Sequence, residues 1–239
     1  MILNLISGPR NISTALMYSF AQRLDTKVID EPFYAFYLSR FPELDHPGRA
    51  AVLKRMSNDP TEILKEVRAL HEKHEYIFLK NMAHHHIGLD WSYLRSVKNV
   101  FLIRNPKQLI ASFAQVITHP TLQDIGLKEE ADLLDYIEQH SDQRPIVIDS
   151  NQILQHPEKG LSRLCQELSI PFSKKMLSWK KGPIPEDGVW AAYWYRNVHD
   201  STGFSKQPTS ERPLPQHCKA LYEEALPYFE KLNNYALKI

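Results

Sequence analysis

The sequence has few cysteines, little net charge and no long apolar run. Cys165 and Cys218 are the only cysteines among 239 residues, and their wide spacing excludes a disulfide framework and a CxxC motif. Such sparse cysteine usage is typical of a reducing compartment. The formal net charge of +1 creates no overall field that would attract nucleic acid, so any basic site must be local.

Apolar segments are too short for a membrane anchor. None approaches the ~20 residues that span a bilayer. The apolar run at the N-terminus ends at Gly8-Pro9-Arg10 and is too short for the core of a signal peptide. We therefore expect a cytoplasmic protein without stable membrane insertion. The length, with 43% hydrophobic and 24% charged residues, favours a single domain over residues 1–239.

Short apolar segments alternate with helical patterns along the chain. Strands are expected at residues 2–6, 26–30, 76–80, 99–103 and 145–148. Helices are expected at residues 13–23, 60–73, 106–116, 128–140, 158–168 and 215–238. Connecting or lid segments are expected at residues 44–59 and 178–212. This alternation predicts an α/β protein, with three α/β/α layers around a parallel five-stranded sheet.

The segment from Met1 to Phe20 joins a buried strand to a helix through a polar turn. The turn has the sequence Ser7-Gly8-Pro9-Arg10-Asn11-Ile12-Ser13-Thr14. The N–H groups of such a turn and the positive end of the helix dipole can hold one anion. An ordinary strand–turn–helix connection with Ser13 as N-cap is the alternative. The pattern favours a phosphate site at the start of the chain.

The same turn is not a Walker A loop, which needs Gly, four residues and then Gly-Lys-Ser/Thr. Four residues after Gly8 the chain has Ser13-Thr14-Ala15, so the second glycine and the lysine are absent. A Walker lysine serves the β- and γ-phosphates. This loop therefore suits a ligand without a γ-phosphate, held without a metal by the hydroxyls and N–H groups of Ser13 and Thr14.

A second anion-binding site is expected at Arg104 and Ser112; this site and the opening turn are here called the two anion grips. Arg104 follows the fourth predicted strand, and Ser112 lies two helical turns further along the chain. Arginine supplies a forked, permanently charged donor, and serine adds a hydroxyl. Two separate grips indicate a nucleotide that is phosphorylated at two places.

Charged residues follow the ends of all the predicted strands. In parallel sheets, ligands bind beyond the carboxyl ends of the strands, which share one edge. We therefore expect these residues to converge: Arg10, Glu31, Lys80, Arg104 and Asp149.

Together the two grips resemble the sulfotransferase superfamily, whose donor is 3′-phosphoadenosine-5′-phosphosulfate. Residues 7–14 are similar to its 5′-phosphosulfate loop, and residues 104–112 to its 3′-phosphate motif. Residues 149–172 resemble its late strand–helix segment, which ends in Ile-Pro-Phe. The likeness covers most of residues 1–175 and is nearer to bacterial sulfotransferase-like proteins than to the cytosolic phenol enzymes.

This resemblance implies a P-loop NTPase-like sulfotransferase fold and a reaction. A sulfuryl group would pass to a hydroxyl or amine of a small or lipid-like acceptor, without a metal. Arg10 would stabilise the transferring group. The implied donor contacts are Gly8, Pro9, Arg10, Asn11, Ile12, Ser13, Thr14, Arg104 and Ser112. A late basic loop would add Arg196 and Lys206, although this region departs from the Gly-x-x-Gly-x-x-Lys pattern of the family.

The acceptor must lose a proton, so a general base is expected at the site. Cytosolic members of the superfamily use a His two residues after a strand-end Lys, but Met82 stands at that distance from Lys80. The candidates are Glu31, which we favour, and His84, with Lys80 as a further catalytic candidate. Because consecutive histidines face different directions, at most two of the three at 84–86 reach the cleft, and no metal site is expected.

Two other functions are compatible with the sequence. One is a P-loop kinase that uses ATP and Mg²⁺, since residues 146–149 resemble a Walker B strand, although no lysine precedes Thr14. The other is a non-catalytic nucleotide-binding homologue, because the late loop departs from the family pattern. The aromatic group between Trp179 and Tyr195 either packs beneath its loop or walls an acceptor pocket.

Overall fold

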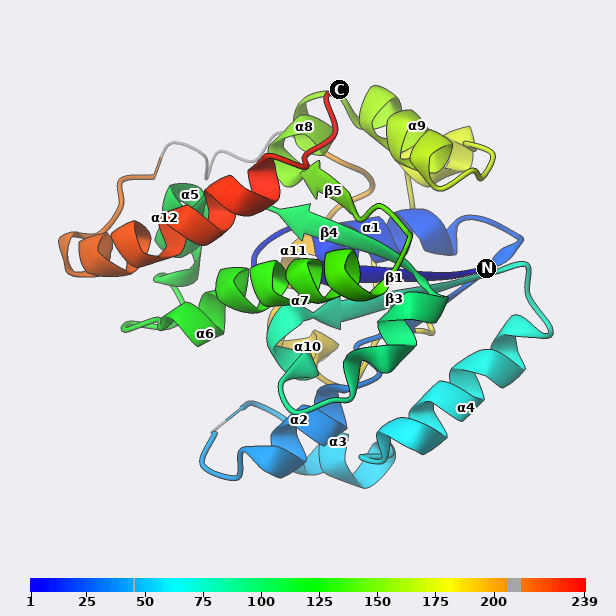
Figure 1. The fold of residues 1–239 in the computed structure, drawn as a ribbon, viewed down its shortest axis with the longest axis horizontal. Helices are drawn as coiled ribbons and strands as arrows, with labels where there is room; N and C mark the ends of the chain where they lie inside the picture. The colour runs from blue at the N-terminus through cyan, green and yellow to red at the C-terminus, as the bar shows by residue number, and fades with distance from the viewer. Residues whose placement is uncertain (45, 206–211) are drawn as a thin grey trace.

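A five-stranded parallel sheet forms the centre of the protein (Figure 1). The computed structural model describes residues 1–44, 46–205 and 212–239. The strands are β1 (Ile2–Ser7), β2 (Thr26–Asp30), β3 (Tyr76–Met82), β4 (Lys98–Ile103) and β5 (Ile146–Asp149). Their order is β2-β3-β1-β4-β5, and every neighbouring pair is parallel. The predicted α/β class and parallel five-stranded sheet are confirmed.

Helices cover both faces of this sheet (Figure 1). The longer ones are α1 (Ser13–Ala21), α4 (Pro60–His71), α5 (Pro106–Phe113), α7 (Leu127–His140), α9 (Pro157–Glu167) and α12 (Lys219–Asn233). The shorter ones are α2 (Tyr34–Arg40), α3 (Arg49–Arg55), α6 (Leu122–Ile125), α8 (Ser150–Gln155), α10 (Ala191–Trp194) and α11 (Arg196–His199). None of the described helices combines the length and apolarity needed to cross a bilayer.

Alternating side chains of β1 divide the core into two layers. Leu3 and Leu5 pack with buried residues of α1 and α9, whereas Ile6 packs with buried residues of α5, α7 and α12. All three side chains are almost completely buried. A strand that is buried on both faces carries an apolar run rather than a polar alternation, which is why residues 2–6 were recognisable as a buried strand.

A row of buried asparagines fixes the central strands relative to one another. Asn81 of β3 donates to Asn4 of β1 over 2.8 Å, and Asn4 donates to Asn99 of β4 over 3.0 Å. Asn99 in turn donates to the carbonyl of Leu94 over 2.7 Å. Because a buried polar group without a partner is costly, this row disfavours any shift of these strands along one another.

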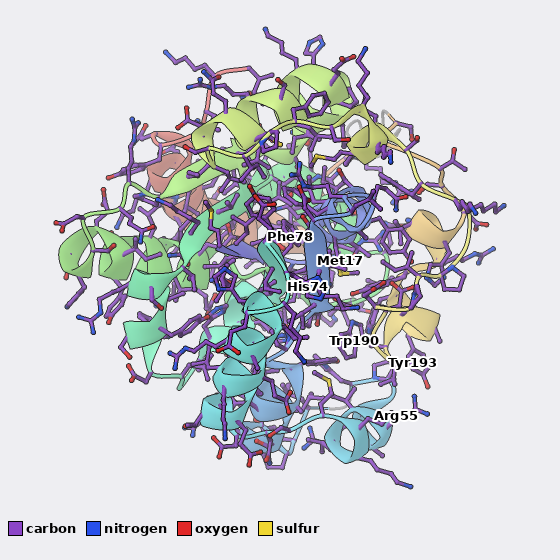
Figure 2. The ribbon with its side chains drawn as sticks, turned by 90° about the vertical axis from the view of Figure 1, so that its right-hand side faces the viewer. Met17, Arg55, His74, Phe78, Trp190 and Tyr193 are labelled. Carbon is purple, nitrogen blue, oxygen red and sulfur yellow. The ribbon has the colours of Figure 1, made fainter. Side chains whose placement is uncertain are left out.

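The two segments expected as connections contain short helices and meet each other. Residues 44–59 include α3, and the described part of 178–212 includes α10 and α11. A Cβ atom at Gly48 would come within 2.8 Å of the Tyr193 ring, so the turn before α3 packs against α10. Figure 2 shows Trp190 nearer the centre of the molecule than Tyr193. Trp190 is buried and Tyr193 is more than half exposed.

Candidate functional site

A cavity of about 310 Å³ opens beyond the carboxyl ends of the strands. Eleven of the residues selected from the sequence line it: Pro9, Arg10, Asn11, Ile12, Ser13, Thr14, Glu31, Lys80, His84, Arg104 and Ser112. Gly8 and Arg196 do not line it, and Arg196 is exposed on α11. Lys206 lies outside the described residues. The parallel sheet therefore brings together side chains that come from different strands.

Two expected strand ends need correction. Lys80 does not follow β3 but lies inside it, because β3 continues to Met82, which pairs with Ser7 of β1. Asp149 is the last residue of β5 and does not line the cavity. Its carboxylate accepts the backbone N–H of Asn151 over 2.8 Å and caps α8.

The opening turn has an unusual backbone. Arg10 has a φ of 59° and Ile12 a φ of 50°, and Glu31 on the neighbouring loop has a φ of 45°. Among the described residues only one other non-glycine residue, Ser169, has a positive φ. Such conformations cost about 1–3 kcal/mol each and persist where surrounding structure enforces them, often at functional sites.

The start of α1 is left without a side-chain cap. Ile12 rather than Ser13 occupies the N-cap position, and no side chain there accepts a hydrogen bond from the first turn. Ser13 is therefore the first residue of the helix, and both Ser13 and Thr14 line the cavity. The first-turn N–H groups and the helix dipole are thus available to an anion at this end of α1.

Close packing beneath the turn explains the glycine at position 8. A Cβ atom on Gly8 would overlap the backbone carbonyl oxygen of Ile125, at the end of α6. Glu130 of α7 lies under the same point, completely buried, and neither carboxylate oxygen has a well-formed hydrogen bond among the described residues. Burial raises the pKa of Glu130 well above its ordinary value, which the N–H of Gly8 only partly offsets.

Two guanidinium groups connect the turn to the second predicted grip. Arg10 Nε donates to Ser112 Oγ over 3.2 Å, and Arg104 Nη1 donates to the backbone carbonyl of Arg10 over 2.6 Å. Burial, and next the charge of Arg10, lower the pKa of Arg104. Burial lowers the pKa of Arg10 as well, with Arg212 as the second cause. Three cations within electrostatic reach create a strongly anion-attracting end of the cavity.

Below the other end of the cavity lies a buried hydrogen-bonded group, here called the Lys80 cluster and defined as Asp30, Glu31, Lys80, Trp190 and Tyr195. Lys80 Nζ contacts both carboxylates, with 3.1 Å to Asp30 Oδ1, and lies 2.6 Å from Tyr195 Oη. Tyr195 Oη is 2.8 Å from both oxygens of Asp30 and accepts the indole N–H of Trp190 over 2.9 Å. The cluster thus joins β2 and β3 to the segment around α10.

Burial, together with the neighbouring charges of this cluster, sets the proton affinity of Glu31. Burial, opposed by Lys80 and assisted by Asp30, raises the pKa of Glu31 to about 7. Burial favours the neutral amine of Lys80, but Asp30 and Glu31 outweigh it and raise the pKa of Lys80. A carboxyl group that titrates near neutral pH is well matched to general base catalysis.

The histidines at 84–86 form a buried 3₁₀ turn after β3. His84 and His85 line the cavity, whereas His86 points to Tyr93, with 2.8 Å between Nε2 and the hydroxyl. Burial lowers the pKa of His84 to about 3 and that of His86 to about 4, so both are neutral at physiological pH. In the described part of the chain no group of three His, Cys, Asp or Glu side chains could hold a metal ion.

Aromatic rings line the remainder of the cavity. Tyr34 stacks on His85 with ring centroids 4.7 Å apart, and Tyr37 lies 5.0 Å from both His84 and His85. Trp190 meets Tyr34 edge-on at 5.0 Å. These rings give an apolar compartment with polar edges next to Glu31, suitable for an organic acceptor.

The sequence named Tyr195 only as one of an aromatic group that could wall an acceptor pocket, and it gave no role to Asp30, Arg212 or Glu130. Asp30 and Tyr195 are 165 positions apart along the chain, and Arg212 and Glu130 carry no motif. For Asp30 the available signal was a carboxylate at the end of a predicted strand, directly before Glu31. Their roles depend on contacts between distant segments.

Known proteins resemble this chain over nearly its whole length. It is 40% identical to the branched-chain-amino-acid aminotransferase-like protein 1 of Arabidopsis thaliana over 96% of the chain. It is 36% identical to protein 2 of the same name and organism over 97% of the chain. It spans only 41% of the length of each of these relatives.

Solved structures share the fold at lower identity. The sulfotransferase domain of the curacin biosynthetic pathway aligns with a TM-score of 0.56 and 17% identity, covering 93% of this chain and 96% of that one. A sulfotransferase from Alicyclobacillus acidocaldarius aligns with a TM-score of 0.51 and 14% identity, covering 97% and 94%. The family model described as "Sulfotransferase domain" matches residues 1–236. The chain therefore belongs to the sulfotransferase domain family.

Proposed function

We propose that this protein transfers a sulfuryl group from 3′-phosphoadenosine-5′-phosphosulfate to a hydroxyl or amine of a small organic acceptor. The observation that carries the proposal is the junction of the two anion grips. Arg10 of the opening turn bonds Ser112, and Arg104 bonds the backbone of Arg10, within one cavity. A single nucleoside with phosphates at both ends can bridge grips placed in this way.

The opening turn would hold the 5′ end of the donor. N–H groups at the start of α1 and the hydroxyls of Ser13 and Thr14 would bind the 5′-phosphate, and Arg10 would face the transferring group. Negative charge builds on the oxygens around sulfur and on the leaving phosphate during transfer. A preorganised guanidinium at that position lowers the barrier because it needs no rearrangement as the charge develops.

Arg104 and Ser112 would hold the 3′-phosphate. Both side chains are buried, so the charge-assisted hydrogen bonds form away from competing water. Arg212 lies close enough to influence the pKa of both Arg10 and Arg104, and we include it as a further cation that attracts the donor.

Glu31 would take the proton of the acceptor. The acceptor oxygen or nitrogen forms its bond to sulfur, the bond between sulfur and the 5′-phosphate breaks, and the proton passes to the Glu31 carboxylate. Glu31 suits this role better than His84, because its pKa of about 7 lies near the working pH whereas the pKa of about 3 makes His84 a weak base. The other product is adenosine 3′,5′-bisphosphate.

Ligand-dependent thermal unfolding tests the nucleotide assignment. Adenosine 3′,5′-bisphosphate should raise the unfolding midpoint without added metal, because a ligand of the native state stabilises it in proportion to its binding. ATP with Mg²⁺ should have little effect. A midpoint that responds to ATP with Mg²⁺ but not to the bisphosphate would favour the kinase interpretation instead.

Two variants test the assigned roles of the arginines. Arg104→Ala should weaken bisphosphate binding by more than about tenfold, because a buried charge-assisted contact is lost. Arg163→Ala on α9, which does not line the cavity, is the matched control and should bind normally. An unchanged dissociation constant for Arg104→Ala would reject the 3′-phosphate assignment.

Arg10→Ala should reduce turnover more than binding, since its main contribution is expected in the transition state. The measurement uses radiolabelled donor with a panel of phenols, alcohols and amines, alongside bisphosphate binding by calorimetry. If binding fell strongly while turnover per bound donor was preserved, Arg10 would be a ground-state contact only.

A further inference from the structure

Two neighbouring carboxylates share one lysine in the Lys80 cluster, and their surroundings differ. Asp30 accepts hydrogen bonds from Lys80 at 3.1 Å, from the Tyr195 hydroxyl at 2.8 Å and from the backbone N–H of Gly188 at 3.1 Å. Its carboxylate is therefore bonded by an ammonium, a hydroxyl and an amide. Burial raises the pKa of Asp30, and Lys80, the Tyr195 hydroxyl and the Gly188 N–H each oppose that rise by stabilising the charged form.

Glu31 has fewer fixed partners. Its Oε1 contacts Lys80 and lies 3.4 Å from the Tyr195 hydroxyl, whereas the polar contact of its Oε2 within the described part of the chain is the Nδ1 atom of His85 at 3.8 Å. Unlike Asp30, Glu31 lines the cavity. Of two adjacent carboxylates with one lysine, the better bonded one keeps the negative charge and the other titrates.

We propose that Asp30 and Tyr195 are positioning residues: Asp30, held by Tyr195, is the carboxylate that neutralises Lys80, so that Glu31 accepts the acceptor proton. This inference rests on the proposed function and deepens it, because it explains how a base can titrate beside a buried lysine. Without Asp30, the Lys80 ammonium would belong to Glu31 entirely and would hold it as an inert carboxylate.

The tyrosine also connects the base to a distant segment. Tyr195 follows α10, and its hydroxyl accepts the indole N–H of Trp190, a wall of the cavity. The wall of the acceptor compartment and the proton acceptor are thus positioned by the same hydroxyl group. A displacement of this segment would change the proton affinity of Glu31 without any change in Glu31 itself.

The titration of Glu31 depends on every charged or titratable group that faces it. From β2 and β3 these are Asp30 and Lys80, and from the segment after α10 it is Tyr195. His85 lies at 3.8 Å, and burial together with Glu31 raises the pKa of Tyr34 on α2. Near neutral pH the His85 ring is neutral, because burial lowers its pKa, and the Tyr34 hydroxyl keeps its proton. Asp30, Lys80 and Tyr195 therefore govern the titration of Glu31.

Carbon-13 NMR of the full chain carrying glutamate labelled at the side-chain carboxyl provides the readout. The Glu31 signal is assigned by its disappearance in Glu31→Gln. In the wild type it should titrate near pH 7. In Asp30→Asn the midpoint should fall by about one unit or more, because a neighbouring negative charge is removed and Lys80 pairs with Glu31 alone.

Tyr195→Phe should move the midpoint in the opposite direction. Glu31 loses a hydroxyl contact, and Asp30, having lost its hydroxyl donor, draws Lys80 more strongly. The Glu31 midpoint should therefore rise by about half a unit or more. Tyr193→Phe, two residues away and exposed, is the matched control and should leave the midpoint unchanged.

Opposite shifts in the two near-isosteric variants would support the proposal, since a purely structural role gives no reason for opposite signs. Either variant decides alone if the other fails to fold. Unmoved midpoints, or a wild-type Glu31 that stays ionised down to pH 5, would overturn it. Bisphosphate binding, measured on the same samples, separates the two proposals: its absence rejects the proposed donor but leaves the assignment of charges standing.

Discussion

Replacing Glu130 by Gln should stabilise the protein increasingly as the pH rises. Glu130 is completely buried beneath the opening turn, and its oxygens lack well-formed hydrogen bonds among the described residues. Burial raises its pKa well above 4.5. The folded protein therefore keeps this proton at pH values where the unfolded chain has released it, and stability falls as the pH rises above about 4.5.

The size of the effect follows from proton linkage. One proton held only by the folded state costs about 1.4 kcal/mol of unfolding free energy per pH unit. Between pH 5 and 6.5 the difference between Glu130→Gln and wild type should therefore grow steadily in favour of the variant, with a slope of at most about 1.4 kcal/mol per pH unit. Gln has nearly the shape of a neutral carboxyl group but cannot ionise. A pH-independent cost of burying the Gln amide changes the stability difference by the same amount at every pH, so the slope of this difference with pH is unchanged.

Urea unfolding at several pH values between 5 and 6.5 measures this slope. The quantity to compare is the unfolding free energy of the variant minus that of the wild type, because other buried groups make the stability of both proteins rise with pH. His84 and His86, with pKa values lowered to about 3 and about 4, remove stability as the pH falls below 6.5. Glu66→Gln on the exposed side of α4 is the control and should stay within about 0.5 kcal/mol of wild type. A Glu130→Gln difference that is constant with pH would refute a protonated Glu130.

Two further predictions concern packing that supports the site. Gly8→Ala should destabilise the fold by about 1–3 kcal/mol and weaken bisphosphate binding, because the new methyl group overlaps the backbone of Ile125; normal urea stability and binding would show that the turn tolerates a side chain. Asn4→Leu should cost about 2 kcal/mol or more in urea unfolding, because it leaves polar atoms of Asn81 and Asn99 buried without Asn4 as partner. A loss below about 1 kcal/mol would mean that water or a repacked neighbour replaces Asn4.

Local sequence patterns predicted most of the strands and the longer helices. The apolar runs of the strands and the capping residues of the helices act over a few neighbouring positions. Asp59, for example, caps α4 through the N–H of Thr61, as its position before Pro60 predicts. Alternation of strands and helices then leaves few arrangements other than a parallel sheet covered on both faces. The short helix α3 was not predicted, since seven residues offer too little periodicity.

In the candidate site, too, local sequence patterns placed some residues correctly and could not place others. Arg104 and Ser112 lie on one strand–helix unit, so their spacing in the sequence already placed them near each other. Lys80 was expected at a strand end but lies within β3, where its charge is matched by Asp30 and Glu31. No local pattern distinguishes such a lysine from a solvated one.

The sequence by itself determined the strand–turn–helix at the start of the chain, the Arg104–Ser112 pair and the sulfotransferase type of architecture, because each depends on residues close together in the chain. Tertiary structure alone decided that Tyr195 meets Asp30, 165 positions away, and that Glu130 lies beneath Gly8. These contacts are made by packing of distant segments, and the burial and neighbouring charges that result set which of these groups carry a proton.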